Sequence, residues 1–149
     1  MSTPERAPAT GEQTPATGEQ LARAWFEHAP MIGLLGLRLV AIGEDEATVE
    51  LPFRESLATA GDVVHGGAIM SLIDTAAALA AWSRHDPAEG VRWGTVGVSV
   101  SFLSAARGAD LSARAQVSRR GRAISFCRVE VLDGDGGRVA EGLVSYRLG

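Results

Sequence analysis

One long helical segment set among alternating strands most constrains the fold of this chain. Residues 66–84 keep the spacing of an amphipathic helix, with an apolar stripe made of Ile69, Leu72, Ile73, Ala76 and Ala80. Most other side chains of the segment are small, so this helix can pack close to whatever covers it. Its best apolar stretch, from Ala68 to Trp82, is interrupted by Ser71, Asp74 and Thr75 and is too short to span a bilayer.

On both sides of this helix, apolar and polar residues alternate with a period of two, which predicts strands with one buried face. The apolar sets are Leu37, Leu39 and Ala41; Ala47, Val49, Leu51 and Phe53; Val96, Val98, Val100 and Phe102; Leu111, Ala113, Ala115 and Val117; and Cys127, Val129 and Val131. A last strand is predicted at 138–148. Turn residues separate the strands at 43–45, 106–110, 119–122 and 133–137, and a loop is predicted at 54–65. We therefore expect an α+β fold in which a curved antiparallel sheet wraps around one long central helix.

The 149 residues are enough for one domain and too few for two ordinary ones. Residues 1–20 are rich in Pro, Thr, Gly and Glu and repeat the hexapeptide Pro-Ala-Thr-Gly-Glu-Gln, which predicts a disordered tail. The folded domain is expected at 21–149. A short amphipathic helix is predicted from about Glu19, and Pro30 is expected to stop it.

Composition excludes several classes of function. The formal net charge of -4 argues against nucleic acid as a partner. The single cysteine, Cys127, excludes an intramolecular disulfide and a cysteine-based metal cluster, and it is predicted to be a buried structural thiol. The three histidines lack ligand-like spacing, so neither a metal nor another cofactor is expected. Without a membrane-spanning stretch or the apolar core of a signal peptide, we expect no membrane partner and a cytoplasmic location.

Two features of residues 63–76 suggest chemistry. Gly66 and Gly67 open the helix, and their backbone N–H groups can face a ligand where the helix dipole favours negative charge. Asp74 lies within an otherwise apolar helix, where burying a carboxylate costs free energy unless it has a partner or a functional role. Plainer interpretations remain open, namely a turn followed by a cap for the glycines, a solvated side for Asp74, and backbone partners for His65.

The run His-Gly-Gly at 65–67, then six residues, then Asp-Thr-Ala at 74–76 resembles the signature of the hotdog-fold acyl-CoA thioesterases. The likeness is to the phenylacetate-pathway-like group within the 4-hydroxybenzoyl-CoA thioesterase superfamily. It covers roughly residues 30–149, and the strand at 99–106 and the basic turn at 118–122 also resemble this family. The resemblance implies a hotdog fold and hydrolysis of an acyl-CoA thioester to the free acid and CoA.

The resemblance also implies roles for individual residues. Gly66, flanked by His65 and Gly67, would polarise the thioester carbonyl through its backbone N–H. Asp74 would be the general base for water or, as the alternative, the attacking carboxylate. Thr95 would help to hold the water. Thr59 stands where the family commonly has Asn, and Asp62 stands where it often has Gly, which affects rate and substrate preference more than reaction class.

For the CoA arm, the resemblance implies contacts with one group of residues, in which arginines would lie near the phosphates. The group is Gly97, Phe102, Arg119, Arg120, Gly121 and Arg122. Without the family, the three arginines would be interpreted as a solvated hairpin tip. The sequence leaves open the acyl group and the choice between CoA and an acyl-carrier protein.

The spacing of Gly66 and Asp74 gives one inference that needs no family. Eight residues on one helix separate them by roughly 12 Å, so a carbonyl held by the first is out of reach of water activated by the second on the same helix. If both act in one reaction, they come from two chains, which predicts a two-fold homodimer with two equivalent sites. In the family, such dimers often pair into homotetramers.

Two other functions remain as alternatives. A non-catalytic acyl-CoA-binding or sensing domain could use the same fold, and Thr59 in place of Asn keeps this alternative open. A hotdog dehydratase would need a His paired with an acid, a context that His65 lacks.

Overall fold

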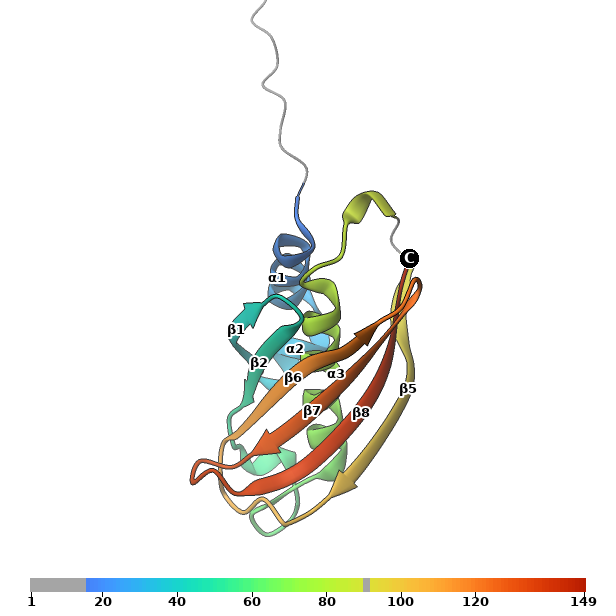
Figure 1. Ribbon diagram of the computed structural model, residues 1–149. Coiled ribbons are helices and arrows are strands. Elements are labelled where there is room, and N and C mark those ends of the chain that lie inside the picture. The colour runs from blue at the N-terminus through green and yellow to red at the C-terminus, as the bar shows by residue number, and fades with distance from the viewer. Residues whose placement is uncertain (1–15, 90–91) are drawn as a thin grey trace, which may run out of the picture.

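The computed structural model describes residues 16–89 and 92–149 (Figure 1). Its helices are α1 (Gly18–His28), α2 (Pro30–Leu35) and α3 (Gly66–Trp82), with single 3-10 turns η1 (Glu55–Leu57) and η2 (Pro87–Glu89). Its strands are β1 (Arg38–Gly43), β2 (Glu46–Leu51), β3 (Ala58–Ala60), β4 (Val63–Val64), β5 (Trp93–Phe102), β6 (Leu111–Arg120), β7 (Ile124–Leu132) and β8 (Arg138–Leu148). Six strands form one antiparallel sheet in the order β1-β2-β6-β7-β8-β5, and β3 pairs with β4 in a separate ribbon.

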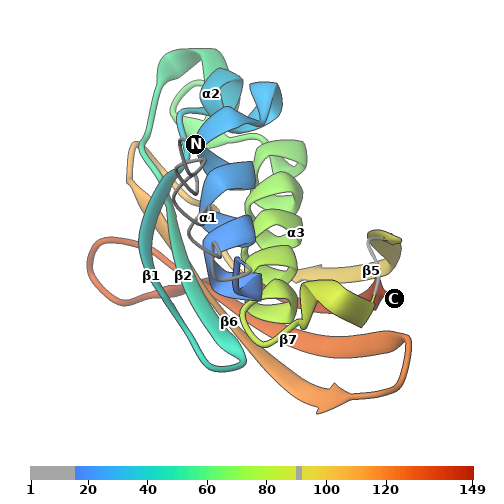
Figure 2. The ribbon, with the colours of Figure 1, turned by 90° about the horizontal axis from the view of Figure 1, so that it is seen from above.

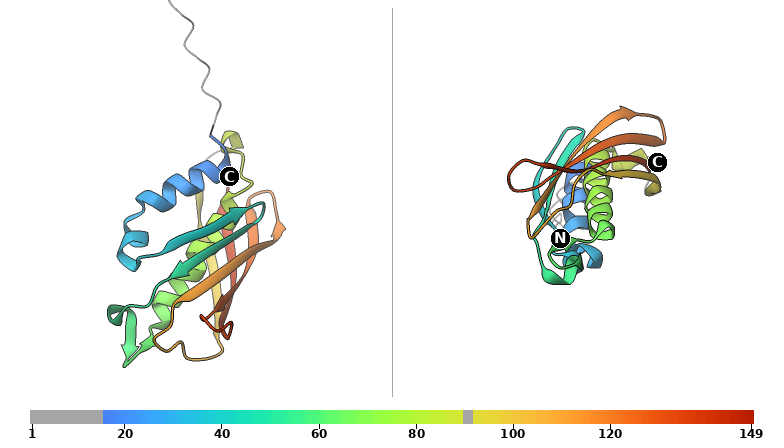
Figure 3. Two further views of the ribbon diagram at one scale, coloured as in Figure 1. Left: turned by 90° about the vertical axis from the view of Figure 1, so that its left-hand side faces the viewer. Right: turned by 90° about the horizontal axis from the view of Figure 1, so that it is seen from below.

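The three helices lie on one side of the sheet, and α3 runs across its inner face (Figure 2). The strands curve around α3 (Figure 3). All five residues of the predicted apolar stripe are buried, at most 3% exposed. Close packing is required at Gly142 in β8, where a Cβ atom would lie 2.5 Å from the Cγ2 atom of Ile73. The predicted α+β architecture of one helix wrapped by a curved antiparallel sheet is therefore confirmed.

The predictions for the N-terminal region need two corrections. The expected tail, 1–20, overlaps α1, which begins at Gly18 because Thr17 and Gln20 form a capping box there. Most of that tail lies outside the described residues. Pro30 was expected only to stop a helix, but it is also the first residue of α2. At this position the N–H that Pro lacks would have no acceptor within the helix.

Strand β5 forms one edge of the sheet and departs from the predicted alternation. Its register against β8 shifts between Thr95 and Gly97, so Val96 is an extra residue in a bulge and is 59% exposed. Thr95 lies opposite Tyr146 and Phe102 lies opposite Ala140, both buried residues of β8. The prediction that Val96 shares the buried face of Val100 and Phe102 was therefore wrong, and Phe102 itself is half exposed.

Other boundaries also differ from the prediction. Arg119 and Arg120 belong to β6, which leaves only 121–123 for the turn that was predicted at 119–122. A bulge in β1 follows Leu39 and leaves Ala41 exposed, although it was predicted to face inward. The predicted loop 54–65 contains η1 and the β3–β4 ribbon. Within the described residues, no helix is both long enough and apolar enough to cross a membrane.

Candidate functional site

The N-terminus of α3 is capped by the side chain of the preceding residue. His65 is the N-cap, and its Nδ1 atom accepts a hydrogen bond from the N–H of Gly67 at 2.8 Å. Because Nδ1 must be unprotonated to accept, the hydrogen of the neutral ring lies on Nε2. The backbone of His65 is held as well, since its N–H donates to the carbonyl of Leu57 at 2.7 Å. These two hydrogen bonds agree with the plainer interpretation of His65, in which backbone groups satisfy the residue.

Gly66, the first residue of α3, keeps its backbone donor available. Its N–H has no acceptor within the described part of the chain, whereas the N–H groups of Gly67 and Ala68 are satisfied by His65. A Cβ atom at Gly66 would lie 3.2 Å from the Cζ atom of Phe102, so this aromatic ring covers the glycine on the β5 side. The arrangement offers one backbone donor at a helix N-terminus, beside an aromatic wall.

Asp74 lies half-buried in the middle of α3 and is oriented by β5. The hydroxyl of Thr95 donates to the Oδ1 atom of Asp74 at 2.5 Å. Tyr146 lies opposite Thr95 in β8, and burial raises the pKa of its hydroxyl to about 12, with a further raising contribution from the charge of Asp74. The structure therefore brings Thr95 and Asp74 together, and it gives Asp74 neither a fully solvated nor a fully buried setting.

Gly66 and Asp74 are not brought together within one chain. Both belong to α3, roughly 12 Å apart along its axis. Thr59 is exposed in β3, and within the described residues its side chain has no hydrogen-bond partner. Asp62 forms an ion pair with Arg107 at 3.3 Å. The candidate site in a single chain thus consists of two halves, the Gly66 half and the Asp74 half.

The residues predicted to line a CoA arm fall into separate groups. Gly97 and Phe102 are exposed on β5, Arg119 is exposed near the end of β6, and Gly121 and Arg122 are exposed in the β6–β7 turn. The guanidinium of Arg120 is already engaged, because it binds Asp45 at 2.6 Å and donates to the carbonyl of Ala81 at 3.0 Å. These arginines therefore lie toward the C-terminal end of α3, away from Gly66.

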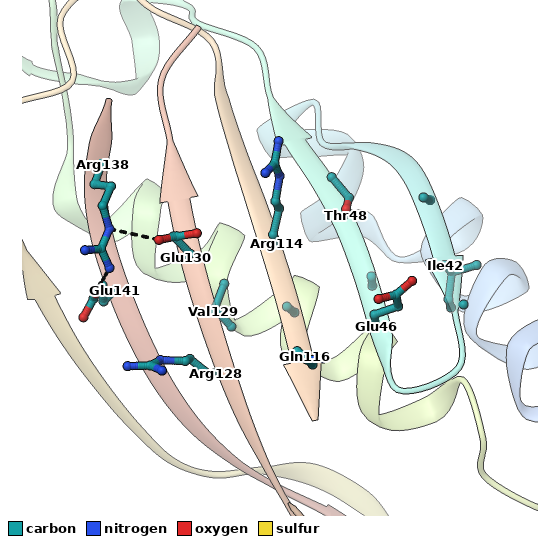
Figure 4. Close-up of a pocket in the computed structure, with 14 residues that line it drawn as sticks. Ile42, Glu46, Thr48, Arg114, Gln116, Arg128, Val129, Glu130, Arg138 and Glu141 are labelled. Atoms are coloured by element: carbon teal, nitrogen blue, oxygen red, sulfur yellow. Dashed lines mark ion pairs between the residues drawn. The ribbon is translucent and has the colours of Figure 1, made fainter. Parts of the chain in front are cut away.

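A hollow of about 510 Å³ lies on the outer face of the sheet, away from α3 (Figure 4). Charged side chains surround it, and Arg138 pairs there with Glu130 at 2.9 Å and with Glu141. None of the predicted site residues lines this hollow. Although it is a prominent depression of the surface, it is separated by the sheet from the groups that can polarise a carbonyl or activate water.

A pocket beside His65 was missed by reasoning from the sequence. It has a volume of about 280 Å³ and lies between α2, the η1–β3 segment and α3, with Met31, Leu35, Leu57 and Ala68 in its walls. The available signal was the sequence 30–35, which begins with Pro and continues with apolar residues, a pattern that also fits a short helix. Because Pro30 was interpreted only as the end of a helix, α2 and the pocket wall that it forms were not predicted.

Two further predictions concern residues outside the site. Cys127 is buried, and burial raises the pKa of its thiol to about 11, so the prediction of a structural thiol is confirmed. Within residues 16–89 and 92–149, no group of three or more His, Cys, Asp or Glu residues is placed to hold a metal ion.

Comparison with known proteins assigns this arrangement to a family. The sequence profile described as the Thioesterase superfamily matches residues 61–140, which include both halves of the candidate site. The chain belongs to the Thioesterase superfamily. It has the hotdog fold and is a thioester hydrolase of the PaaI type. This membership favours hydrolysis over the alternative of a non-catalytic binding domain.

Individual relatives of this thioesterase support the assignment. The chain is 28% identical to the medium/long-chain acyl-CoA thioesterase YigI of Salmonella typhimurium, over 82% of this chain and 87% of that protein. The solved structure of the Escherichia coli PaaI protein, from the phenylacetic acid degradation operon, matches with a TM-score of 0.79 and 26% identity, covering 89% of this chain and 94% of that one. A conserved protein from Pseudomonas aeruginosa matches with a TM-score of 0.74 and 30% identity, covering 80% of this chain and 93% of that one.

Proposed function

We propose that this thioesterase hydrolyses acyl-CoA at two sites, each shared between the subunits of a homodimer. The observation that carries the proposal is the separation of the two halves of the candidate site. Gly66 has a free N–H, Asp74 has a carboxylate oriented by Thr95, and both residues lie on one helix. Neither half suffices alone, because a carbonyl bound at one lies out of reach of water activated at the other.

The surface between the two halves supports dimerisation. Strand β5 is at the edge of the sheet, with one side unpaired in the single chain, and apolar side chains lie exposed along it and on α3. These are Met70 at 44%, Val98 at 40% and Phe102 at 51%. An exposed apolar patch of this kind, next to an unpaired strand, is typical of a protein–protein interface.

A two-fold axis through this surface would complete both sites. Met70 lies midway along the chain between Gly66 and Asp74, and Val98 and Ser99 lie midway between Thr95 and Phe102. If β5 paired antiparallel with its copy about its middle, near Val98, the Phe102 end of each strand would lie beside the Thr95 end of the other. Because Phe102 covers Gly66 and Thr95 binds Asp74, the two halves would meet across the axis. Pairing of two such dimers into a tetramer is compatible with this arrangement.

In the proposed reaction, the Gly66 N–H binds the carbonyl oxygen of the thioester. Asp74 of the partner subunit takes a proton from water, and the resulting hydroxide attacks the carbonyl carbon. The negative charge that develops on the carbonyl oxygen is stabilised by the helix N-terminus. Collapse of this intermediate breaks the C–S bond, and the thiolate of CoA leaves and takes up the proton. Direct attack by the carboxylate of Asp74 is the alternative route.

The other predicted residues have supporting roles in this proposal. Thr95 would fix the carboxylate, and His65 would hold Gly67 and so the first turn of α3. Gly97 and Phe102 would border the pantetheine arm. Arg119 and Arg122 would meet CoA phosphates near Gly121, whereas Arg120, already paired with Asp45, would contribute mainly through its charge. Thr59 would border the carbonyl from the β3–β4 ribbon.

Thiol release from a panel of acyl-CoAs tests the activity directly. We expect wild type to release CoA, and we expect Asp74→Asn to lower kcat by about 10²- to 10⁴-fold, the usual range for a lost general base, with an unchanged circular dichroism spectrum. A folded Asp74→Asn variant with wild-type kcat would contradict the proposal.

Co-expression of two inactive variants tests whether the site is shared. Gly66→Pro removes the N–H at the first helical position, which tolerates Pro, and the ψ angle of 134° at His65 suits a residue that precedes Pro. Mixed with Asp74→Asn, it should restore about a quarter of wild-type activity, because half of the randomly paired dimers would carry one intact site. If both groups acted within one chain, mixing would restore nothing.

A further inference from the structure

The pocket between α2, the η1–β3 segment and α3 has walls suited to an apolar group. Met31, Leu35, Leu57 and Ala68 contribute aliphatic surface, and no Arg, Asp or Glu lines the pocket among the described residues. The hydroxyl of Ser71, which also lines the pocket, is already engaged because it donates to the carbonyl of Gly67 at 2.9 Å. A carboxylate placed in this pocket would lose hydration without gaining a cationic partner, so the walls favour uncharged ligands.

The pocket lies next to Gly66, whose N–H would bind the carbonyl oxygen. His65 and Gly67, the residues on either side of Gly66, both line it. Phe102 covers Gly66 from the direction of β5. A thioester carbonyl bound at Gly66 would therefore lie between the Phe102 ring and the pocket, with one substituent passing along the ring and the other entering the pocket.

We propose that this pocket binds the acyl group of the substrate and selects uncharged acyl groups of medium size, aliphatic or aryl. This inference rests on the function proposed above. The CoA arm leaves on the β5 side, past Phe102, and the acyl group lies between α2 and α3. The volume of about 280 Å³ holds at most about nine groups of the roughly 30 Å³ that one water-sized group occupies.

Met31 lines the pocket and is partly exposed to solvent. Its side chain is 53% exposed, and the flexible thioether can adjust to acyl groups of different shape. Leu34 lies on the same short helix and is 70% exposed, but it does not line the pocket. These two residues provide a matched pair of variants, because each substitution introduces a charge at an exposed position of the same helix.

The experiment measures kcat/KM for acyl-CoAs from acetyl to palmitoyl, together with phenylacetyl-CoA and glutaryl-CoA. Wild type should gain about fourfold per methylene, from roughly 0.8 kcal/mol per buried CH₂, and should stop gaining at about eight to ten carbons. Glutaryl-CoA should be hydrolysed at least about tenfold more slowly than hexanoyl-CoA. Met31→Glu should lower the octanoyl-to-acetyl ratio of kcat/KM by about tenfold, whereas Leu34→Glu should leave this ratio within about twofold of wild type.

Three outcomes would overturn the acyl pocket while leaving the thioesterase intact. They are equal rates for all acyl lengths, efficient hydrolysis of glutaryl-CoA, and an equal change of the ratio in Met31→Glu and Leu34→Glu. Absence of hydrolysis for every acyl-CoA would instead contradict the proposed function itself. The two failures are therefore distinguishable in one data set.

Discussion

The two ends of α3 are built in opposite ways. At the C-terminal end, Ser83 accepts the N–H of Asp45 at 2.9 Å, and Arg120 joins Asp45 to the carbonyl of Ala81. At the N-terminal end, two glycines follow His65, one N–H has no acceptor within the described chain, and a pocket is open alongside. The carbonyl groups that end a helix are thus partly tied to side chains, while a donor that begins it remains for a ligand.

Aromatic packing strengthens the same contrast. The three tryptophans gather near the C-terminal end of α3, where Trp82 contacts Trp93 and Trp93 contacts Trp25, with ring centres 6.2 and 6.4 Å apart. A Cβ atom on Gly18 would lie 2.3 Å from the backbone oxygen of Trp82, so α1 packs directly against this end. Side chains thus fix the C-terminal end of α3, whereas the N-terminal end keeps a donor for a ligand. We therefore expect a division between the two ends, in which changes at the N-terminal end lower the rate and changes at the C-terminal end lower the stability.

Of the changes that compare the two ends of α3, the largest effect should come from removing the free donor at the N-terminal end. Gly66→Pro should lower kcat by about 10²- to 10³-fold, the usual loss for one oxyanion donor. Gly66→Ala is the matched control, since it places the same Cβ atom against Phe102 but keeps the N–H, and it should lose less than about tenfold. Steady-state thiol release with both variants measures the difference, and equal losses would show that crowding matters rather than the donor.

At the C-terminal end, the expected effect is on stability. Asp45→Ala removes the acceptor of both Arg120 and Arg84, which should cost about 2 kcal/mol, within the range for hydrogen bonds to charged groups. For a chain of this size, Tm should fall by about 4–8 °C in a thermal melt. The kcat of the folded protein should stay within about twofold of wild type. A large loss of kcat at an unchanged Tm would contradict the division between the two ends.

The link between β5 and Asp74 should have a smaller effect. Thr95→Val removes the hydroxyl that donates to Asp74 while keeping the shape of the side chain, and it should lower kcat by about fivefold to tenfold, since a hydrogen bond of this kind contributes about 1–1.5 kcal/mol. Thr95→Ser keeps the hydroxyl and should recover most of the rate. If Ser and Val lost equally, the methyl group of Thr95 rather than its hydroxyl would be responsible.

The smallest effect concerns pH. Partial burial raises the pKa of Asp45, but the hydrogen bonds and charges of Arg120 and then Arg84 outweigh burial, so its pKa in the folded protein is below the ordinary value of 3.8. The unfolded state therefore binds a proton more readily than the folded state, and ionised Asp45 stabilises the fold above that ordinary value. The stability difference between wild type and Asp45→Asn should be full at pH 7 and should shrink as the pH falls below about 4. Denaturant melts across this range would measure it, and a constant difference would contradict the lowered pKa.

The sequence allowed local features to be predicted where one residue pattern determines one structure. The spacing of Ile69, Leu72 and Ile73 identified the buried stripe of α3, and alternation identified most strands. The bulge at Val96 was not predictable, because Val96, Val98 and Val100 keep the period-two alternation of a regular strand. The Asp45 network was missed because its partners Ser83 and Arg120 lie 38 and 75 residues away, so no local pattern joins them.

The candidate site was predictable in part for the same reason. Gly66 and Asp74 lie on one helix, so helix geometry alone gave their separation. From the family resemblance, Thr95 was expected to help hold the water, and in the structure its hydroxyl donates to Asp74. The pocket beside His65 depends on α2, η1 and α3 meeting in space, and the function of Pro30 as a helix start was not evident from its neighbours. Reasoning from sequence is weakest where three short segments build one surface.

The bulge in β5 determines which side chains of that strand face α3. Thr95 and Phe102 are seven positions apart, and in a regular strand an odd separation places two side chains on opposite faces. The extra residue Val96 reverses this parity, so both side chains face α3, one at Asp74 and the other at Gly66. Deleting Val96 would preserve every chemical group of the site and still separate them, because one of the two would be turned to the far side of the sheet. The site is therefore sensitive to the count of residues in β5 as well as to their identity.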